Sequence, residues 1–300
     1  MKAAVSKYYG PPENIKILEV AKPIPKDNEI LVRVYASSVN RTDCGFLRAK
    51  PFVTRFFSGL LKPRQPILGC EFAGKVEQIG KNVTLFKIGD RVFGFDDVNW
   101  GGHGQYKIIE ELASVVTIPK NISFETAATS TEGAHYALTY INTLEKIGAK
   151  KVLVHGATGA IGSAAVQLFK QMGFTVTATT NTKNIKLVKS LGPDKVIDWQ
   201  KQDFTTDTEK YDAVFDAVGK SSFKRCKPLL KPKGIYIATE LGPKGQNPFL
   251  GLISPIYKVY GTKRVLFPLP PNNKQLIEFI AERLADSSFK PVIDKTRLTN

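Results

Sequence analysis

The feature that most constrains the fold is a glycine-spaced turn, HGATGAIG at 155–162, between an apolar run, KVLV, and an Ala-rich stretch, SAAVQLF. The run has the length of a buried strand, and Ala165, Leu168, Phe169 and Met172 recur at the spacing of one helix face. Glycine suits such a turn, because a backbone without Cβ can bend sharply, approach a pyrophosphate and let the helix pack on the sheet. Strand, turn and helix together predict the first βα unit of a dinucleotide-binding fold; the alternative is a mere tight turn.

Within the turn, Gly159 and Gly162 occupy the second and third places of a G-x-G-x-x-G pattern, and Ala157 occupies the first. A helix that begins at about Ala160 presents free N–H groups and a partial positive charge to phosphate. We therefore predict that the turn binds the pyrophosphate of the cofactor. The predicted contact residues are Ala157, Thr158, Gly159, Ala160, Ile161 and Gly162.

The choice of cofactor depends on the loop after the next strand, TVTATT. NADH enzymes usually place an acidic residue about 20 residues after the glycines to bind the ribose 2′-hydroxyl, and a 2′-phosphate repels that carboxylate. Residues 163–193 contain no Asp or Glu, and the loop reads Asn181, Thr182, Lys183 and Asn184. These donors suit a 2′-phosphate, so we expect NADPH. The alternative is that Lys183 is a solvated loop lysine in a basic chain.

The two halves of the chain differ in their patterns. After the turn, further strands are expected in the runs TVTATT, KVIDW, YDAVFDAVG, GIYIATE and RVLFPLP, with helical segments between them. Before about residue 120, short β-rich runs alternate with Gly, Pro, Asn and Asp turns. The predicted fold class is α/β, with a β-rich domain at 1–122 followed by a doubly wound parallel sheet at 123–286.

Composition argues against several classes of protein. The chain has 300 residues, of which 42% are apolar, and no run approaches the ~20 apolar residues of a membrane span, so we expect a cytoplasmic protein without membrane contact. Cys44, Cys70 and Cys226 form no CxxC pair, which argues against a disulfide framework and a zinc ribbon. The formal charge of +16 attracts anions, but the lysines are scattered along the chain, so we expect no specific nucleic-acid partner.

Seven stretches carry a family resemblance: YGPPENIKILEV, NEILVRVYASSVNRTD, GCEFAGKV, FKIGDRVFGF, GATGAIGSAAVQL, SLGPDKVID and YDAVFDAVGKSSF. In order and spacing they resemble the medium-chain dehydrogenase/reductase superfamily, in its zinc-independent branch of quinone oxidoreductases and enone reductases. The resemblance implies a GroES-like catalytic domain at 1–122, a Rossmann NADP(H)-binding domain at 123–286 and a return segment to the catalytic domain at 287–300. Relatives continue further with a helix and a strand, so we expect either a fragment or a homodimer that covers the open sheet edge.

The resemblance also implies a reaction without zinc. Zinc-dependent members bind the metal through a Cys, a His and a third ligand, and here Asn40 and Cys70 stand at the first two positions. A site built from Cys70, Glu71 and either Cys44 or His103 is the alternative, although tetrahedral zinc needs three or four well-placed ligands. Without a Lewis acid, we expect hydride transfer from NADPH to a small electrophilic substrate, a quinone or an α,β-unsaturated carbonyl. An NADPH-binding protein without turnover and an alcohol dehydrogenase-like enzyme with an unusual metal site are the two competing interpretations.

Candidate catalytic residues follow from the same resemblance. Asn40 matches an Asn on the substrate side and is expected to orient the carbonyl group, the alternative being a loop Asn that bonds its own backbone. His135 stands where the family brings a Thr near the nicotinamide, and Glu132 precedes it by three residues. Together they are expected to donate or relay a proton; the alternative is helix capping and packing. The apolar and basic stretch at 45–66 is expected to line the pocket, with core packing and membrane contact as alternatives.

Further cofactor contacts are implied residue by residue. Ala217, Val218 and Gly219 resemble the strand end that approaches the nicotinamide ribose, and Thr239 to Leu241 resemble the next such loop. Trp199 stands where the family often has a Tyr near the adenosine, which keeps the stacking surface without the hydroxyl group.

Overall fold

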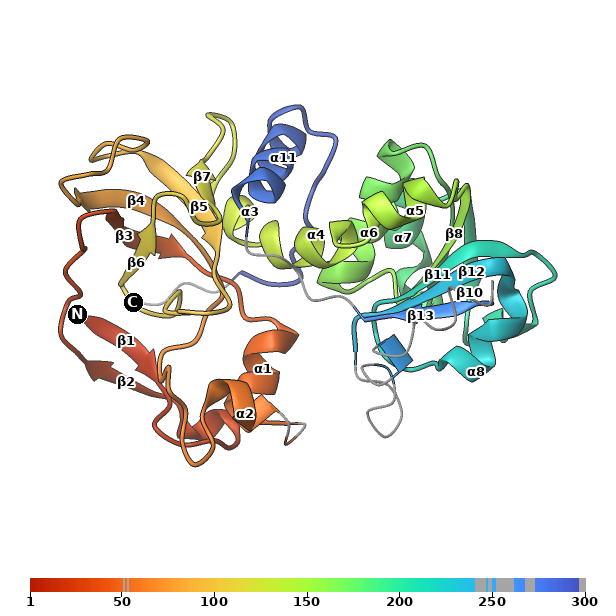
Figure 1. The fold of residues 1–300 in the computed structure, drawn as a ribbon, viewed down its shortest axis with the longest axis horizontal. Helices are drawn as coiled ribbons and strands as arrows, with labels where there is room; N and C mark the ends of the chain where they lie inside the picture. Colours follow the sequence, from red (N-terminus) through yellow and green to blue (C-terminus); the bar gives the residue numbers. More distant parts are fainter. Residues whose placement is uncertain are drawn as a thin grey trace. The chain divides into compact units, whose positions relative to one another are not determined.

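The chain forms two units, each with its own sheet, and the computed structural model in Figure 1 describes residues 1–50, 52, 54–240, 247, 250–251, 262–267 and 273–296. Unit 1 comprises Met1–Glu132, Asn272–Ser287 and Ile293–Asn300, and unit 2 comprises Gly133–Pro271 and Ser288–Val292. Because each unit has a sheet and core of its own, each is described separately.

Unit 1 is built on a five-stranded antiparallel sheet in the order β6-β3-β4-β5-β7, beside a two-stranded ribbon of β1 and β2. The strands are β1 (Lys2–Val5), β2 (Lys16–Glu19), β3 (Glu29–Ala36), β4 (Glu71–Ile79), β5 (Arg91–Phe95), β6 (Tyr106–Glu110) and β7 (Val115–Thr117). The helices are η1 (Pro12–Asn14), α1 (Arg41–Arg48), α2 (Thr54–Ser58), α3 (Phe124–Ala128) and α11 (Lys274–Ala285). Alternating strand residues such as Ile30 and Val32 point to one face and pack with Phe72 and Val76 in the core of this unit.

Unit 2 is built on a six-stranded parallel sheet in the order β10-β9-β8-β11-β12-β13. The strands are β8 (Lys151–His155), β9 (Thr175–Thr180), β10 (Lys195–Asp198), β11 (Tyr211–Asp216), β12 (Leu230–Ala238) and β13 (Arg264–Leu266). The helices are α4 (Thr131–Leu138), which crosses the unit boundary, α5 (Ile141–Lys146), α6 (Ala160–Gln171), η2 (Thr182–Asn184), α7 (Ile185–Ser190), η3 (Phe204–Thr206), α8 (Phe223–Cys226) and η4 (Lys227–Leu229). Counted from β8, the strand order is 3-2-1-4-5-6, which is the order of a dinucleotide-binding sheet. The predicted α/β fold class is confirmed.

The units divide ten residues later than the expected boundary at residue 122, because α3 groups with unit 1. The ring of Phe124 stacks on Tyr35 with the ring centroids 4.8 Å apart. The guanidinium group of Arg91, on β5, lies 4.7 Å from the centre of the Phe124 ring. These aromatic and cation–π contacts attach α3 to the antiparallel sheet.

The C-terminal elements also group differently from the expected domains. α11 falls within the expected 123–286 domain but groups with unit 1, where Lys274 Nζ donates to the carbonyl oxygen of Glu111 at 2.8 Å. Of the expected return segment at 287–300, Ser288–Val292 groups with unit 2 and the residues from Ile293 group with unit 1.

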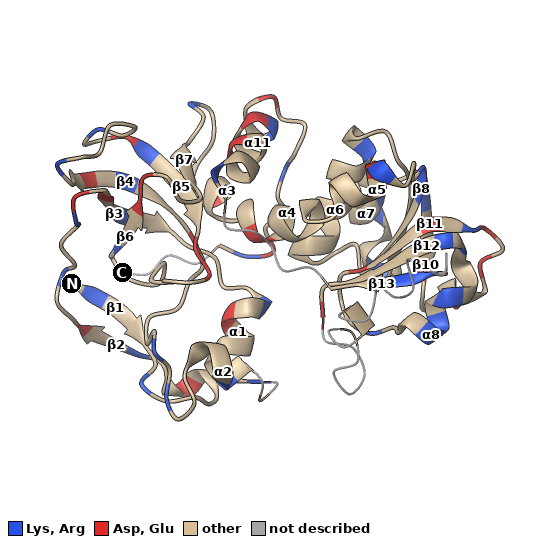
Figure 2. Ribbon diagram, viewed as in Figure 1, with Lys and Arg blue, Asp and Glu red and all other residues tan. Residues whose placement is uncertain are grey.

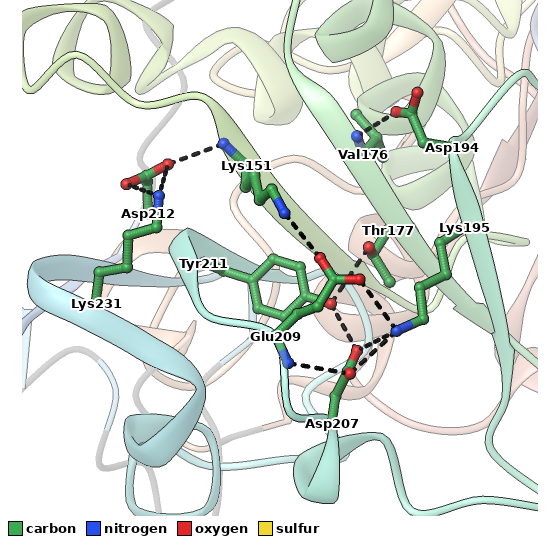
Figure 3. Close-up of polar contacts among 10 residues, drawn as sticks. All are labelled: Lys151, Val176, Thr177, Asp194, Lys195, Asp207, Glu209, Tyr211, Asp212 and Lys231. Atoms are coloured by element: carbon green, nitrogen blue, oxygen red, sulfur yellow. Dashed lines mark hydrogen bonds and ion pairs between the residues drawn. The ribbon is translucent and has the colours of Figure 1, made fainter.

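Ion pairs fasten the amino ends of the parallel strands in unit 2 (Figure 3). The carboxylate of Asp212 accepts the N–H of Lys151 at 2.9 Å and pairs with Lys231 at 2.9 Å, so it joins β8, β11 and β12. The carboxylate of Glu209 lies 3.0 Å from Nζ of Lys151 and 3.4 Å from Nζ of Lys195. Ligands of such sheets bind at the opposite, carboxyl ends of the strands, which this network leaves free.

Lysine and arginine residues are spread over both units, with acidic residues among them (Figure 2). The positive charge of the chain is therefore distributed over many elements.

None of the helices in the described ranges is long and apolar enough to cross a membrane.

Candidate active site

The glycine turn at the carboxyl end of β8 leaves a helix N-terminus accessible. α6 begins at Ala160, as predicted, with Gly159 as its N-cap, and no side chain in the described part of the chain caps it. No described atom lies within 4 Å of the place of a Cβ on Gly159, whereas a Cβ on Gly162 would lie 2.1 Å from the carbonyl oxygen of Gly156. The turn is therefore tight on its sheet side and open on the side where a phosphate group would meet the helix N–H groups.

Two further loops lie beside the turn within unit 2. A Cβ on Gly156 would lie 2.5 Å from the side chain of Val218, and a Cβ on Gly219 would lie 2.4 Å from the side chain of Glu240. Asp216, at the end of β11, holds the first loop, because its carboxylate accepts the N–H groups of Val218 at 3.1 Å and Gly219 at 2.9 Å. The predicted cofactor residues at this edge are those at 157–162 and 217–219 together with Thr239, whereas Leu241 lies outside the described residues.

A carboxylate that the sequence did not predict contacts the loop after β9. The hydroxyl group of Thr182 donates to Asp198 at 2.5 Å, and its N–H donates to Oε1 of Gln200 at 3.1 Å. Asp198 ends β10, and parallel pairing places it opposite Thr180 at the end of β9. Lys183 is exposed in the same loop. The loop therefore offers a cation and an anion to whatever group the ribose carries at its 2′ position.

The remaining residues of this edge fit a dinucleotide cofactor. Asn181 caps η2 by accepting the N–H of Asn184 at 3.1 Å, which fixes the start of the loop. Trp199 follows β10 with its side chain 48% exposed, so a ring is available for stacking on adenine. The hydroxyl oxygen of Thr180 is buried at the end of β9 and has no hydrogen-bond partner among the described residues. The turn would hold the pyrophosphate, and this loop would hold the adenosine ribose.

In unit 1, residues at the starts of α1, β4 and α4 form a largely buried polar group, here called the carboxylate cluster: Asn40, Thr42, Asp43, Cys70, Glu71, Thr131 and Glu132. Asn40 caps α1, since its side-chain oxygen accepts the N–H of Asp43 at 3.0 Å and its own N–H donates back to Asp43 at 2.9 Å. Its amide nitrogen lies 3.2 Å from the sulfur of Cys70 and 3.4 Å from Oε2 of Glu71. Asn40 therefore caps its own backbone and also directs an N–H donor into the cluster.

Glu71 is the residue of this cluster whose role the sequence did not indicate. Its Oε1 accepts the N–H of Thr131 at 3.0 Å, the hydroxyl of Thr131 at 2.8 Å and the N–H of Glu132 at 2.6 Å. Glu71 thus caps α4 from β4, whereas the hydroxyl of Ser130 donates backwards to the carbonyl oxygen of Ala127 at 2.7 Å. An acidic residue that opens the otherwise buried strand EFAG was the available signal.

Glu132 is buried, with 3% of its surface exposed, and its carboxyl group bonds the hydroxyl of Thr42. Burial and the charge of Glu71 raise the pKa of Glu132 well above its ordinary value. Burial is the main cause that raises the pKa of the Cys70 thiol well above its ordinary range, and the carboxyl group of Glu132 acts in the same direction. The Cys70 thiol is therefore protonated at neutral pH, and burial favours the protonated form of Glu132.

The predicted partner of Glu132, His135, is buried in the same helix, α4. Glu132 groups with unit 1 and His135 with unit 2. The structure therefore brings Asn40 and Glu132 into one cluster and places His135 one helical turn further along α4.

The residues considered as zinc ligands have other roles. Nε2 of His103 lies 2.8 Å from the carbonyl oxygen of Ser38 and 3.9 Å from the carboxylate of Asp43. Cys70 packs in an apolar group with Leu47 and Trp100. Among the residues that the structure describes, no three His, Cys, Asp or Glu side chains are arranged to hold a metal ion.

The parallel sheet with its glycine turn and the β-rich unit with its polar cluster define a class of protein, the two-domain dehydrogenases and reductases. Residues 26–120 match the family Alcohol dehydrogenase GroES-like domain, and residues 160–282 match the family Zinc-binding dehydrogenase. The chain is 32% identical to the chloroplastic quinone-oxidoreductase QR1 of Triphysaria versicolor, over 96% of this chain and 88% of that protein. It is 31% identical to the chloroplastic NADPH-dependent alkenal/one oxidoreductase of Arabidopsis thaliana, over 73% of this chain and 58% of that protein.

A solved quinone oxidoreductase from Coxiella burnetii has a similar structure, with a TM-score of 0.81 and 25% identity, over 96% of this chain and 88% of that chain. The chain belongs to the medium-chain dehydrogenase/reductase superfamily, in its quinone oxidoreductase-like branch. The predicted resemblance and the GroES-like character of the N-terminal domain are confirmed, and the chain is an oxidoreductase of the quinone and enone reductase type.

Proposed function

We propose that this oxidoreductase uses NADPH to reduce quinones or α,β-unsaturated carbonyls without zinc. The observation that carries the proposal is the state of the carboxylate cluster. The position of one family zinc ligand is taken by Asn40, whose amide nitrogen faces the cluster at 3.2 Å from Cys70, and Cys70 itself holds its proton. Zinc prefers thiolate, imidazole and carboxylate ligands, and the amide of Asn40 is none of these, so this pair is a poor metal site.

The preference for NADPH is supported by the donors of the adenosine loop. Lys183, Thr182 and Asn181 follow β9, where the ribose 2′ group would lie. The name of the Arabidopsis relative, an NADPH-dependent alkenal/one oxidoreductase, supports the same cofactor and the same substrate class. Asp198 opposes this preference, because its carboxylate would repel a 2′-phosphate.

In this proposal each predicted residue has a task that its position permits. NADPH, when bound, supplies a hydride to the electron-poor carbon of the substrate. Asn40 orients the substrate carbonyl through its amide group, and Glu132 supplies the proton that completes the reduction. His135 stays a candidate for the nicotinamide side of α4. The substrate is a small electrophile, and cytoplasmic location, homodimer formation and the absence of a nucleic-acid partner stay predictions.

The test is NADPH oxidation by the purified protein, followed at the nicotinamide absorbance near ~340 nm with a panel of quinones and enones. NADH is run alongside, and bound zinc is measured by elemental analysis. We expect turnover with NADPH, slower turnover with NADH, and less than stoichiometric zinc.

Three results would count against the proposal. Binding of NADPH without turnover on the whole panel would favour a binding protein. Stoichiometric zinc, with activity that a chelator abolishes, would favour an alcohol dehydrogenase-like enzyme with another metal arrangement. A clear preference for NADH would overturn the role given to Lys183.

A further inference from the structure

The two central carboxyl groups of the carboxylate cluster are bonded very differently. Glu71 accepts five donors: the N–H and hydroxyl of Thr131, the N–H of Glu132, the hydroxyl of Ser38 and the amide nitrogen of Asn40. In the described part of the chain, the carboxyl group of Glu132 bonds one group, the hydroxyl of Thr42. A protonated carboxyl group is the donor in such a bond, which leaves the hydroxyl proton of Thr42 for another acceptor. A carboxylate that accepts several N–H and O–H groups is stabilised in its ionised form.

The position of Glu71 at a helix end adds to this difference. Its Oε1 bonds the first N–H groups of α4, at Thr131 and Glu132, where the helix carries a partial positive charge. Glu71 therefore carries the negative charge of the pair. Two carboxylates held in one buried site cannot both ionise readily, so Glu132 keeps the proton.

The other charged groups around Glu132 also favour a negative charge on Glu71 and a proton on Glu132. Asp43 of α1 and Asp97 after β5 both disfavour a negative charge on Glu132. The ammonium group of Lys107, which interacts with Cys70 of the cluster, is itself paired with Asp96 at 2.9 Å. On its own helix Glu132 is followed three positions later by His135.

We propose that Glu71 is a positioning residue that keeps Glu132 protonated, and that Glu132 is the proton reservoir of the reaction, delivering its proton through the hydroxyl group of Thr42. The inference rests on the proposed function for its use in turnover, while the protonation of Glu132 itself is a property of the free protein. Thr42 is partly exposed and Glu132 is buried, so the residue that bonds the buried carboxyl group itself reaches the surface.

The transfer balances in atoms and charge. The reduced substrate, which carries the hydride and its electron pair supplied by the cofactor, takes the hydroxyl proton of Thr42, while Thr42 takes the proton of Glu132. Glu132 becomes a carboxylate and NADPH becomes NADP⁺. Water then returns a proton to Glu132 through Thr42, because two buried carboxylates side by side repel each other.

The first experiment measures the proton directly, by infrared spectroscopy of the free protein at about pH 8, in the C=O stretching band of protonated carboxyl groups. At that pH Asp97, whose pKa is raised to about 6, is ionised. We expect a band in the wild type that is absent from Glu132→Gln and present in Glu77→Gln, a matched change at a half-buried carboxylate of β4 that pairs with Lys22. Glu71→Gln is expected to shift the titration of the band to lower pH by at least about one unit.

The second experiment tests delivery by steady-state kinetics with a quinone substrate. Thr42→Val removes the hydroxyl group with little change of shape and is expected to lower kcat about 10- to 100-fold, whereas Thr42→Ser retains the wild-type rate within about 3-fold. Circular dichroism checks the fold of each variant. If Glu71→Gln unfolds, two results still test the proposal. The loss of the wild-type band in Glu132→Gln tests the position of the proton, and the kinetics of the Thr42 variants test its delivery.

A wild type without the band at about pH 8, or a band that survives in Glu132→Gln, overturns the assignment of the proton. Equal rates for Thr42→Val and Thr42→Ser overturn the delivery route. The infrared result needs neither cofactor nor substrate, so failure of the reductase proposal and failure of the proton assignment are separate outcomes.

Discussion

Two side chains of opposite charge lie at the loop that would meet the ribose 2′ group: Lys183 within the loop and Asp198 beside it. The carboxylate of Asp198 lies 2.5 Å from the hydroxyl of Thr182, and Lys183 is the next residue along the chain. A 2′-phosphate is attracted by the ammonium group and repelled by the carboxylate. The selectivity for NADPH therefore depends on both residues, and Asp198 limits it.

Asp198→Asn is expected to increase the affinity for 2′,5′-ADP about 2- to 5-fold, since it removes one partly exposed negative charge and keeps the shape. Lys183→Ala is expected to decrease that affinity by a similar factor. Affinity for 5′-AMP, which lacks the 2′-phosphate, is expected to change little in both variants. Isothermal titration calorimetry measures the two ligands on each protein.

Asp194→Asn is the matched control, because Asp194 precedes the same strand at its opposite, amino end, where it bonds the N–H of Val176 at 2.7 Å. It is expected to leave the ratio of the two affinities unchanged. An unchanged ratio in Asp198→Asn as well would show that the 2′ group binds elsewhere.

The residues of this loop were partly predictable from the sequence. Asn181, Thr182 and Lys183 follow a recognisable strand, so their place could be inferred. Asp198 could not, because it enters the loop from the next strand, through the parallel pairing of β10 with β9, and not from the segment directly after the glycines. Asp198 and Thr182 are neighbours because their strands are adjacent in the sheet, and their separation along the chain gives no sign of this.

At the scale of elements, the turn between β8 and α6 needs glycine at two positions for two different reasons. At Gly162 a Cβ would meet the backbone oxygen of Gly156 at 2.1 Å, so the demand is close packing of helix and sheet. At Gly159 a Cβ meets open space, and the backbone has an ordinary extended conformation, with φ of −77° and ψ of 168°. Packing therefore does not explain Gly159, whereas room for a ligand does.

Gly162→Ala is expected to destabilise the free protein by about 1–3 kcal/mol, because a backbone atom must move to admit the methyl group. Gly159→Ala, the matched change three residues away, is expected to leave the melting temperature within about 2 °C of the wild type. Gly159→Ala is nevertheless expected to weaken NADPH binding several-fold, because its methyl group occupies the open face. Thermal unfolding and NADPH fluorescence titration measure the two effects.

Equal NADPH affinity for Gly159→Ala and the wild type would mean that the pyrophosphate does not reach this face. Equal stability for Gly162→Ala and the wild type would mean that the turn relaxes without cost.

The elements themselves were largely predictable, and their contacts were not. The runs KVLV, TVTATT and KVIDW are strands, and the helix after the turn begins at Ala160, because periodicity and glycine act locally. The cap of α4 comes from Glu71, 60 residues before Thr131, so no local capping pattern could reveal it. The carboxylate cluster therefore emerged only from the structure.

At the scale of the whole molecule, the unit boundary follows packing more than pattern. The alternation of strands and helices placed the change at residue 122, but the aromatic contact of Phe124 with Tyr35 carries α3 to unit 1. Sequence periodicity shows that a helix exists and does not show which sheet it covers.

The two units have titratable groups that respond oppositely to acid. In unit 1 burial raises the pKa values of Glu71, Glu132 and Asp43, and burial with Asp96 raises that of Asp97 to about 6. A carboxyl group with a raised folded pKa contributes stability that is complete below its unfolded pKa and is lost as the pH rises through the folded pKa. Unit 1 should therefore become more stable as the pH falls from 7 to 5.

Unit 2 contains a group with the opposite response. Burial lowers the pKa of His155, whose ring stacks on Phe204 with centroids 4.3 Å apart and whose Nδ1 lies 2.7 Å from the hydroxyl oxygen of Thr179. Below its ordinary pKa of about 6.5 the unfolded chain takes up a proton at His155 that the folded unit does not, so unit 2 loses stability as the pH falls.

A second set of groups in unit 2 acts at lower pH. The ammonium group of Lys170 lowers the pKa of Asp194, and that of Lys151 lowers the pKa of Glu209. These carboxylates contribute stability above their unfolded pKa values, and that stability is lost as the pH falls through their folded values. Their effect therefore begins below about pH 4.5 and adds to that of His155.

Hydrogen exchange with mass spectrometry at about pH 7 and pH 5, corrected for the intrinsic exchange rates, resolves the two units in the intact chain. Peptides from β8, β9 and β11 are expected to lose protection at the lower pH, and peptides from β3, β4 and β5 are expected to gain it. In His155→Gln the loss in unit 2 over this interval is expected to disappear while the gain in unit 1 remains, since the titrating groups of unit 1 are unchanged. A common direction of change in both units of the wild type would contradict this prediction, because it would mean that the buried carboxyl groups of unit 1 are already ionised at pH 5 or that His155 is charged in the folded protein.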